Sequence, residues 1–313
     1  MFYICSMTGL HIIWFRQDLR VHDNAALRAA CQAAERDGGA LMALYVLPGG
    51  LDVSEAENST ENRFLFDSLR DLEGALAQRG AVLHLRQGDV TTVLSDILRA
   101  HQVMSVHAHD IWAEDADFCA VEAWSLRAGI PFRLHQQFGP QQDPRTTELW
   151  QTAWERFMAR PRHEAPDRIV TANIGIGQWP RASSSEHTED PPAQRGGRKH
   201  AIQMLRTSVG AGNSGVTMTS AEAIASLKPH IQIGAVSPRE VWQAAVGAHQ
   251  QALKAGLDIR AASIASFLQM LPGLFRPKAA NARPRRASRS TERDITGQQL
   301  SLGLEPSERS NPQ

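Results

Sequence analysis

Cysteine is scarce in this sequence of 313 residues, with only Cys5, Cys31 and Cys119, which are far apart and form no CxxC pair. An odd number of dispersed cysteines argues against a disulfide framework and fits a reducing, cytoplasmic compartment. No apolar run approaches the ~20 residues that a transmembrane helix needs. The apolar N-terminus lacks the basic flank and cleavage site of a signal peptide. We therefore expect a cytoplasmic protein that makes no contact with a membrane.

The sequence also lacks an excess of charge of one sign, because 33 Lys and Arg residues balance 33 Asp and Glu residues. Bulk charge therefore argues neither for nor against nucleic acid as a partner. The glycines at 38–39, 49–50 and 88 mark turns and do not form a dinucleotide fingerprint, and the sequence has no GxxxxGK(S/T) phosphate loop and no Gly-x-Ser-x-Gly nucleophile elbow. His107 and His109 would share one face of a strand, but no third ligand lies nearby, so we expect no metal site.

Short apolar runs alternate with helical patterns through the first 135 residues. This alternation is typical of a parallel sheet covered on both faces. It predicts the α/β class, with a doubly wound five-stranded parallel sheet in a domain over 8–140. The expected strands are 10–15, 40–46, 81–85, 103–107 and 130–134, and the expected helices are 23–36, 61–79, 90–100 and 114–128.

The pattern of expected strands and helices changes after residue 140. An inter-domain connector over 141–196 contains a tryptophan-rich helix at 144–160, in which we expect Trp150, Trp154 and Phe157 to pack in a core. Only helical patterns follow over 197–275, which predicts a partial all-α domain with helices at 197–208, 219–228, 237–254 and 260–271. The basic and polar composition of 276–313 predicts a disordered tail.

A dense cluster of opposite charges follows the first expected strand. Arg16, Asp18 and Arg20 would lie at the carboxyl end of that strand. Asp23 or Asn24 is placed to cap the next helix, because its side chain can accept hydrogen bonds from free backbone N–H groups. We expect an ion-pair network that ties this turn to a neighbouring domain. A direct ligand role for Arg16 or Arg20 is the alternative.

Three stretches carry a resemblance to a known family. "WFRQDLRVHDNAAL" at 14–27 resembles the opening motif of the DNA photolyase/cryptochrome family, where it ends the first strand of an α/β antenna domain. "RGGRKHAIQMLR" at 195–206 and "SLKPHIQIGAVSPREVWQAA" at 226–245 resemble two segments of that family's helical, flavin-binding domain. The three occur in family order with fitting separation, so the resemblance covers about 10–245.

The resemblance implies two cofactor sites. In the family, FAD lies in the helical domain, and hydroxyl and N–H groups of a Thr-Ser-x-Leu-Ser-Pro turn hold its phosphates. Here that turn matches Ser226, Leu227 and Lys228, while Ile224 and Ala225 replace the hydroxyl pair. The turn is therefore degenerate, although the Lys228 ammonium can meet a phosphate as a point charge.

The second implied cofactor is an antenna chromophore of the folate or deazaflavin type. In relatives, the region after the fourth strand borders this chromophore, which makes Asp110 and Trp112 candidate contacts. The family's helical domain extends well beyond the last matched segment and carries the groups that face the flavin and the DNA lesion. We therefore expect a C-terminally truncated member with lost or impaired flavin binding and catalysis, and we assign no catalytic residue.

Three hypotheses about function are compatible with the sequence. The first is a light-driven lyase that splits pyrimidine dimers in DNA, which the resemblance implies. The second is a non-catalytic antenna or nucleotide-binding module, with a protein partner covering the helical part. The third is a truncated gene remnant. Basic residues of the tail could contact DNA phosphates without recognising the base sequence, but a solvated terminus is the simpler interpretation. These residues are Arg276, Lys278, Arg283, Arg285, Arg286, Arg289 and Arg293.

Overall fold

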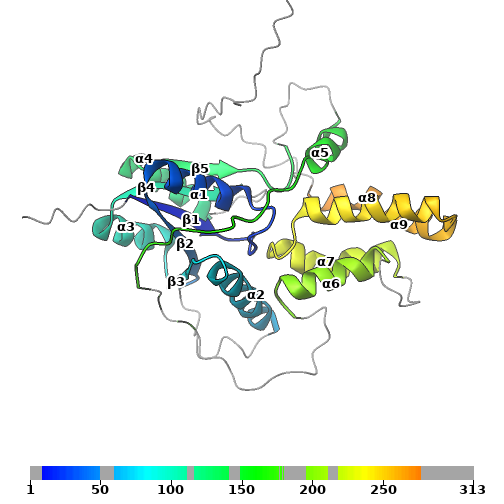
Figure 1. Cartoon of the computed structure of the whole chain (residues 1–313), viewed down its shortest axis with the longest axis horizontal. Coiled ribbons are helices and arrows are strands. Elements are labelled where there is room, and N and C mark those ends of the chain that lie inside the picture. Colours follow the sequence, from blue (N-terminus) through cyan, green and yellow to red (C-terminus); the bar gives the residue numbers. More distant parts are fainter. Residues whose placement is uncertain are drawn as a thin grey trace, which may run out of the picture.

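The computed structural model describes residues 9–49, 60–110, 116–140, 149–175, 177, 179, 195–210 and 218–275. A sheet with its covering helices forms one part of the molecule, and helices alone form the other (Figure 1). The predicted tail at 276–313 lies outside the described residues, as does the polar stretch at 180–194. Nowhere in the described part of the chain does a helix combine the length and apolar character needed to cross a membrane.

The sheet has five parallel strands in the order β3-β2-β1-β4-β5. This order confirms the doubly wound parallel sheet expected from the sequence. The chain reverses direction across the sheet between β1 and β4, and ligands of such folds bind beyond the carboxyl ends of the strands at this point. The strands are β1 (Leu10–Phe15), β2 (Ala40–Leu47), β3 (Leu83–Gln87), β4 (Val103–His109) and β5 (Phe132–His135).

Helices cover both faces of the sheet, as the strand–helix alternation predicts. One apolar cluster joins α1 (Ala25–Asp37) and α2 (Thr60–Ala77) to one face through side chains such as Phe15 and Leu27. A second cluster joins α3 (Val90–Ala100) and α4 (Ala116–Ala128) to the other face through Trp14 and Leu94. Since side chains alternate across a strand, Trp14 and Phe15 point to opposite faces.

The turn between β1 and α1 divides its polar residues between two tasks. Asn24 caps α1, because its side chain accepts a hydrogen bond of 2.8 Å from the backbone N–H of Leu27. Asp23 has a positive φ of 46°, a conformation that Asp and Asn tolerate better than most residues. Of the two predicted capping residues, Asn24 is therefore the cap, and the Asp23 carboxylate is directed elsewhere.

The helical part packs around its own apolar core. Trp154 is fully buried there, and Trp150 and Phe157 are nearly so, which confirms their predicted role in packing. The Trp154 indole N–H donates a hydrogen bond of 2.8 Å to the backbone carbonyl of Phe138, at the end of the sheet domain. The helices are α5 (Trp150–Met158), α6 (Arg198–Ser208), α7 (Ser220–Gln232), α8 (Pro238–Lys254) and α9 (Asp258–Met270), followed by the 3₁₀ turn η3 (Leu271–Leu274).

Helix α7 is longer than the sequence predicts. The expected helix ends at 228, directly before Pro229, but the observed helix continues through Pro229 to Gln232. Its start is fixed by a capping box of Thr219 and Glu222. Buried residues recur at helical spacing beyond the expected end, with Leu227 and Ile231 both in the helical core. This apolar stripe favours continuing the helix, even though Pro229 removes one backbone hydrogen bond.

The first turn of α6 rests on α2 and joins the two parts. No side chain of its own turn caps α6, so α2 supplies acceptors for its free N–H groups. The backbone N–H of Gly197 donates to Ser68 Oγ at 2.9 Å, and that of Arg198 donates to Asp71 Oδ2 at 2.9 Å. A Cβ at Gly196 would lie 2.0 Å from the carbonyl oxygen of Phe64, so only glycine permits this approach.

Candidate functional site

A cleft of about 470 Å³ lies at the carboxyl ends of β1 and β2. The glycine turn between β3 and α3 forms a second wall, and the start of α4 contributes Asp117. The cleft therefore opens at the edge of the sheet where doubly wound folds bind their ligands. The side chains that line it include Trp14, Arg16, Gln17, Tyr45, Asp89 and Asp117.

Aromatic and cationic groups meet in this cleft. The Arg16 guanidinium lies over the Trp14 ring, with its central carbon 4.5 Å from the ring centroid. Guanidinium planes and aromatic rings both stack on flat π-systems. Burial raises the pKa of Tyr45 to about 12, so its phenol stays protonated and can donate a hydrogen bond. These groups suit a planar aromatic ligand.

Two carboxylates, of Asp89 and Asp117, also line the cleft. Asp89 caps α3, and hydrogen bonds from Thr91 and Thr92 lower the pKa of its exposed carboxyl group. Asp117 lies in the exposed first turn of α4. Ionised carboxylates accept hydrogen bonds from hydroxyl and N–H groups and repel anions. These carboxylates therefore favour the hydroxyl-bearing side of a ligand over a phosphate.

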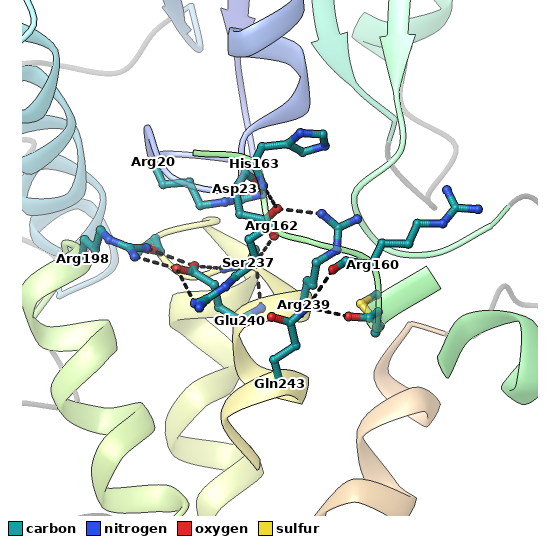
Figure 2. Close-up of polar contacts among 12 residues, drawn as sticks. Arg20, Asp23, Arg160, Arg162, His163, Arg198, Ser237, Arg239, Glu240 and Gln243 are labelled. Atoms are coloured by element: carbon teal, nitrogen blue, oxygen red, sulfur yellow. Dashed lines mark hydrogen bonds and ion pairs between the residues drawn. The ribbon is translucent and has the colours of Figure 1, made fainter. Parts of the chain in front are cut away.

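A polar network joins the β1–α1 turn to the start of α8. The Asp23 carboxylate accepts a hydrogen bond of 2.6 Å from the Ser237 hydroxyl and forms an ion pair of 2.7 Å with Arg239 (Figure 2). It also accepts from the backbone N–H of His163 at 3.1 Å. Burial acts to raise the pKa of Asp23, but Arg239 and Ser237 outweigh it and hold the pKa below its usual value.

The buried guanidinium of Arg20 takes part in the same network. It donates to the backbone carbonyl of Gly234 at 3.0 Å and to Gln137 Oε1 at 3.1 Å, so it links β1, the end of β5 and the α7–α8 turn. Beside it, Asp18 Oδ2 lies 2.7 Å from His109 Nδ1, and both side chains are buried. Burial opposes ionisation of Asp18, but the hydrogen bond from His109 lowers its pKa overall.

A second ion pair lies beside this network and joins α6 to α8 within the helical part. The Arg198 guanidinium makes a two-pronged contact with Glu240, at 2.6 and 3.1 Å, and Glu240 also accepts from the backbone N–H of Ser237. Figure 2 shows Arg198 and Glu240 on one side of the network and Arg239 on the other. The predicted inter-domain ion-pair network is confirmed, with Arg20 inside it. Arg16 instead lines the cleft.

The residues predicted to contact the flavin phosphates lie inside α7, not in a turn. Ser226 Oγ donates to the carbonyl of Glu222 at 2.8 Å, Leu227 is fully buried in the helical core, and Lys228 is exposed. In the interior of a helix, backbone N–H groups bond to carbonyls one turn earlier and are not free to hold an anion. This local geometry does not fit a phosphate-binding turn, and the cofactor role of these residues stays a prediction.

The two predicted antenna contacts have different outcomes. Asp110 follows β4, where its backbone N–H donates to the carbonyl of His135 at 2.7 Å, and it is not among the residues that line the cleft. Trp112 lies outside the described residues. Sequence reasoning passed over Trp14, Tyr45 and Asp117, which do line it. Trp14 and Tyr45 could have been found from the sequence, because ligands of doubly wound folds bind where the parallel strands end and both residues lie near the ends of predicted strands.

The chain was compared with known proteins. Residues 11–137 match the family model described as DNA photolyase. The deoxyribodipyrimidine photo-lyase of Alkalihalophilus pseudofirmus is 22% identical over 288 residues, which cover 84% of this chain and 59% of that protein. This chain therefore spans about three fifths of the length of that relative.

Solved structures share the fold. A Synechocystis cryptochrome superposes with a TM-score of 0.63 and 17% identity, covering 87% of this chain and 61% of that one. An archaeal photolyase from Sulfolobus tokodaii superposes with a TM-score of 0.51 and 16% identity, covering 75% of this chain and 54% of that one. The α/β domain therefore matches the DNA photolyase family model, and the solved structures show that the chain shares the fold of photolyases and cryptochromes.

Proposed function

We propose that the α/β domain binds a planar, light-absorbing chromophore of the folate, deazaflavin or flavin type in the cleft at the ends of β1 and β2. The single observation that carries this proposal is the cleft itself, in which Trp14, Arg16 and Tyr45 meet at the ligand-binding edge of the sheet. A cytoplasmic location is part of the proposal, because Cys31 and Cys119 are free thiols.

The lining residues have distinct tasks in this proposal. The Arg16 guanidinium, which Trp14 supports from below, stacks on the ring system, and the Tyr45 phenol donates a hydrogen bond to a ring carbonyl or nitrogen. Asp89 and Asp117 accept hydrogen bonds from the hydroxyl-bearing side of the ligand. The chromophore, when bound, supplies the absorption of light. The Sulfolobus tokodaii photolyase holds two FAD molecules, with the implication of a novel light-harvesting cofactor in that protein, which supports including a flavin among the candidates.

We further propose that flavin binding at the family's phosphate turn, and with it light-driven repair of DNA dimers, is lost or impaired. Support comes from α7, where the matching residues are helical and Leu227 fills the core. Ile224 and Ala225 offer no hydroxyl group at the matching positions.

A non-catalytic interaction role is the second candidate. Leu253, Leu257 and Ile259 lie at the junction of α8 and α9 with exposed fractions of 55%, 46% and 87%. Adjacent exposed apolar side chains of this size are typical of a surface that another protein covers. A protein partner on the helical part is compatible with a chromophore in the sheet domain, since the two surfaces belong to different parts of the chain.

The experiment is a spectrum of the purified chain after incubation with each chromophore and gel filtration. Chromophore bands retained by the wild type and lost in Arg16→Ala support the proposal. The matched control is Arg99→Ala, since Arg99 is 77% exposed on α3 and pairs only locally with Asp96. Light-dependent dimer repair by the chain would contradict the proposed loss of catalysis. A colourless, aggregating product would instead favour a gene remnant.

A further inference from the structure

A continuous line of polar groups crosses the interior of the α/β domain beneath α1. His11 Nδ1 lies 2.8 Å from Ser105 Oγ, and the same oxygen lies 2.9 Å from His107 Nε2. His107 Nδ1 then lies 3.2 Å from His135 Nε2, with the two rings within 8° of parallel. At the other end, His11 Nε2 lies 3.3 Å from Asp37 Oδ2. The line therefore joins the end of α1 to the end of β5.

The middle of this line is sealed from water and its ends are not. His11, Ser105 and His107 have exposed fractions of 2%, 3% and 1%. At the two ends, the Asp37 side chain is 33% exposed and His135 is partly exposed. The buried line of hydrogen-bonding groups therefore has one end at Asp37, near the start of β1, and the other at His135, at the end of β5.

Asp37 fixes the direction of the chain. The contact between His11 Nε2 and Asp37 Oδ2 is an ion-pair contact and not a hydrogen bond, but a lone pair on Nε2 would face a carboxylate, which favours the proton on Nε2. Nδ1 of His11 then accepts from the Ser105 hydroxyl, whose oxygen accepts from Nε2–H of His107. Nδ1 of His107 in turn accepts from Nε2–H of His135. All three rings share one tautomer.

The charged groups around the line keep the rings neutral. Burial lowers the pKa of His107 to about 3 and that of His135 to about 3, with Arg133 of β5 acting in the same direction on both. Arg36 of α1 faces His11 and His107, while His109 of β4 and His163 of the connector face His135. Burial also lowers the pKa of His11, although Asp37 opposes it. Each ring then carries a single N–H proton.

We propose that this line is a proton relay between Asp37 at the end of α1 and His135 at the end of β5. A proton from water binds Nδ1 of His135, and the Nε2 proton of His135 passes to Nδ1 of His107. The Nε2 proton of His107 passes to the Ser105 oxygen, and the hydroxyl proton of Ser105 passes to Nδ1 of His11. The Nε2 proton of His11 reaches the Asp37 carboxylate and leaves to water.

The balance is one proton in and one proton out. No bond other than N–H and O–H bonds forms or breaks, and no ring carries a lasting charge. Transfer in the reverse direction restores the starting tautomers. The relay therefore couples the protonation of His135 at the end of β5 to that of Asp37 at the end of α1.

The test is nitrogen NMR of the full chain labelled with ¹⁵N-histidine at neutral pH. The relay predicts a protonated Nε2 at His11, His107 and His135 together. In Asp37→Asn the amide can donate or accept, so each of the three histidines is expected to show both tautomers. In Ser105→Ala alone, Asp37 is expected to keep the proton on Nε2 of His11, while His107 and His135 show both tautomers, because the connection to Asp37 is cut.

Ser125→Ala is the matched control, since Ser125 is a buried serine in α4 that bonds only within its helix, to the Glu122 carbonyl. Circular dichroism establishes that each variant is folded. If Ser105→Ala does not fold, the wild type and Asp37→Asn alone decide, because Asp37 lies at the surface. Unchanged tautomers at His107 and His135 in Asp37→Asn overturn the relay, as does a protonated Nδ1 at His11 in the wild type.

Discussion

Asp23 and Arg239 are separated by 216 residues of sequence and form a buried ion pair with an N–O distance of 2.7 Å. Their side chains are 3% and 7% exposed, so both charges have left water. Removing one partner would leave the other charge buried and uncompensated. Such a pair therefore favours this one arrangement of the two domains, even where its net contribution to stability is small.

Asp23→Asn tests this relationship with little change of shape. The positive φ at this position suits Asn as well as Asp, so the backbone is expected to persist. We expect the free energy of unfolding to fall by roughly 3 kcal/mol, because Arg239 loses its counter-ion. Urea denaturation measures the change. Asp96→Asn, at an exposed ion pair with Arg99, is the control and is expected to change stability by less than ~1 kcal/mol. Equal effects in both variants would contradict the assignment.

Gly234 makes the close approach between the helical part and the β1–α1 turn. A Cβ there would lie 2.2 Å from the Gln17 carbonyl oxygen and 2.3 Å from Asp18 Cα, and the φ of 80° is itself unfavourable for alanine. We expect Gly234→Ala to cost at least about 2 kcal/mol of stability. Gly247→Ala, in open space on α8, is expected to stabilise the protein by ~0.5–1 kcal/mol. The same sign in both variants, by thermal denaturation, would refute this account.

Buried histidines make stability depend on pH. Burial lowers the pKa of His230 to about 4, and those of His107 and His135 to about 3. The unfolded chain, with histidine pKa near 6.5, binds more protons below that value, so stability is fully present above about pH 6.5 and falls as pH drops toward 3. Urea midpoints at pH 7 and pH 5 measure the loss. His107→Gln is expected to reduce the slope, and equal midpoints at the two pH values would be inconsistent with neutral buried rings.

The free cysteines are expected to differ in reactivity. Burial raises the pKa of the Cys31 thiol to about 12, so almost no thiolate forms at neutral pH, whereas Cys119 is exposed on α4. In a Cys5→Ser background, a maleimide reagent is expected to modify Cys119 rapidly and Cys31 only on unfolding. Peptide mass spectrometry locates the label. Rapid native modification of Cys31 would show that α1 opens, against the packing described.

Most of the fold could be predicted because local signals agree with tertiary packing. The alternation of apolar runs and helical stripes located all five strands, and α3 falls at the residues expected. The end of α7 was missed because the predicted helix stops before Pro229, while the apolar spacing of Leu227 and Ile231 continues the helix. Here the sequence pattern of the chain itself was the better guide.

The candidate site could be predicted only in part. The charge cluster after β1 indicated a domain contact, but its partners Ser237 and Arg239 lie more than two hundred residues away, and no local pattern joins them. The cleft draws Trp14 and Tyr45 from two strands and Asp117 from a distant helix. The polar line from Asp37 to His135 depends on the pairing of β1, β4 and β5, which exists only once the sheet has formed.

A chromophore could bind in the cleft at the ends of β1 and β2 or at the α7 residues that match the family's phosphate turn, and one measurement distinguishes these two places. Wild type, Arg16→Ala and Lys228→Ala are each incubated with a flavin, a deazaflavin and a folate, and the bound chromophore per chain is measured by absorbance after gel filtration. We predict one chromophore per chain in the wild type and in Lys228→Ala, and its loss in Arg16→Ala. Retention in Arg16→Ala with loss in Lys228→Ala would place the ligand at α7 and contradict the account.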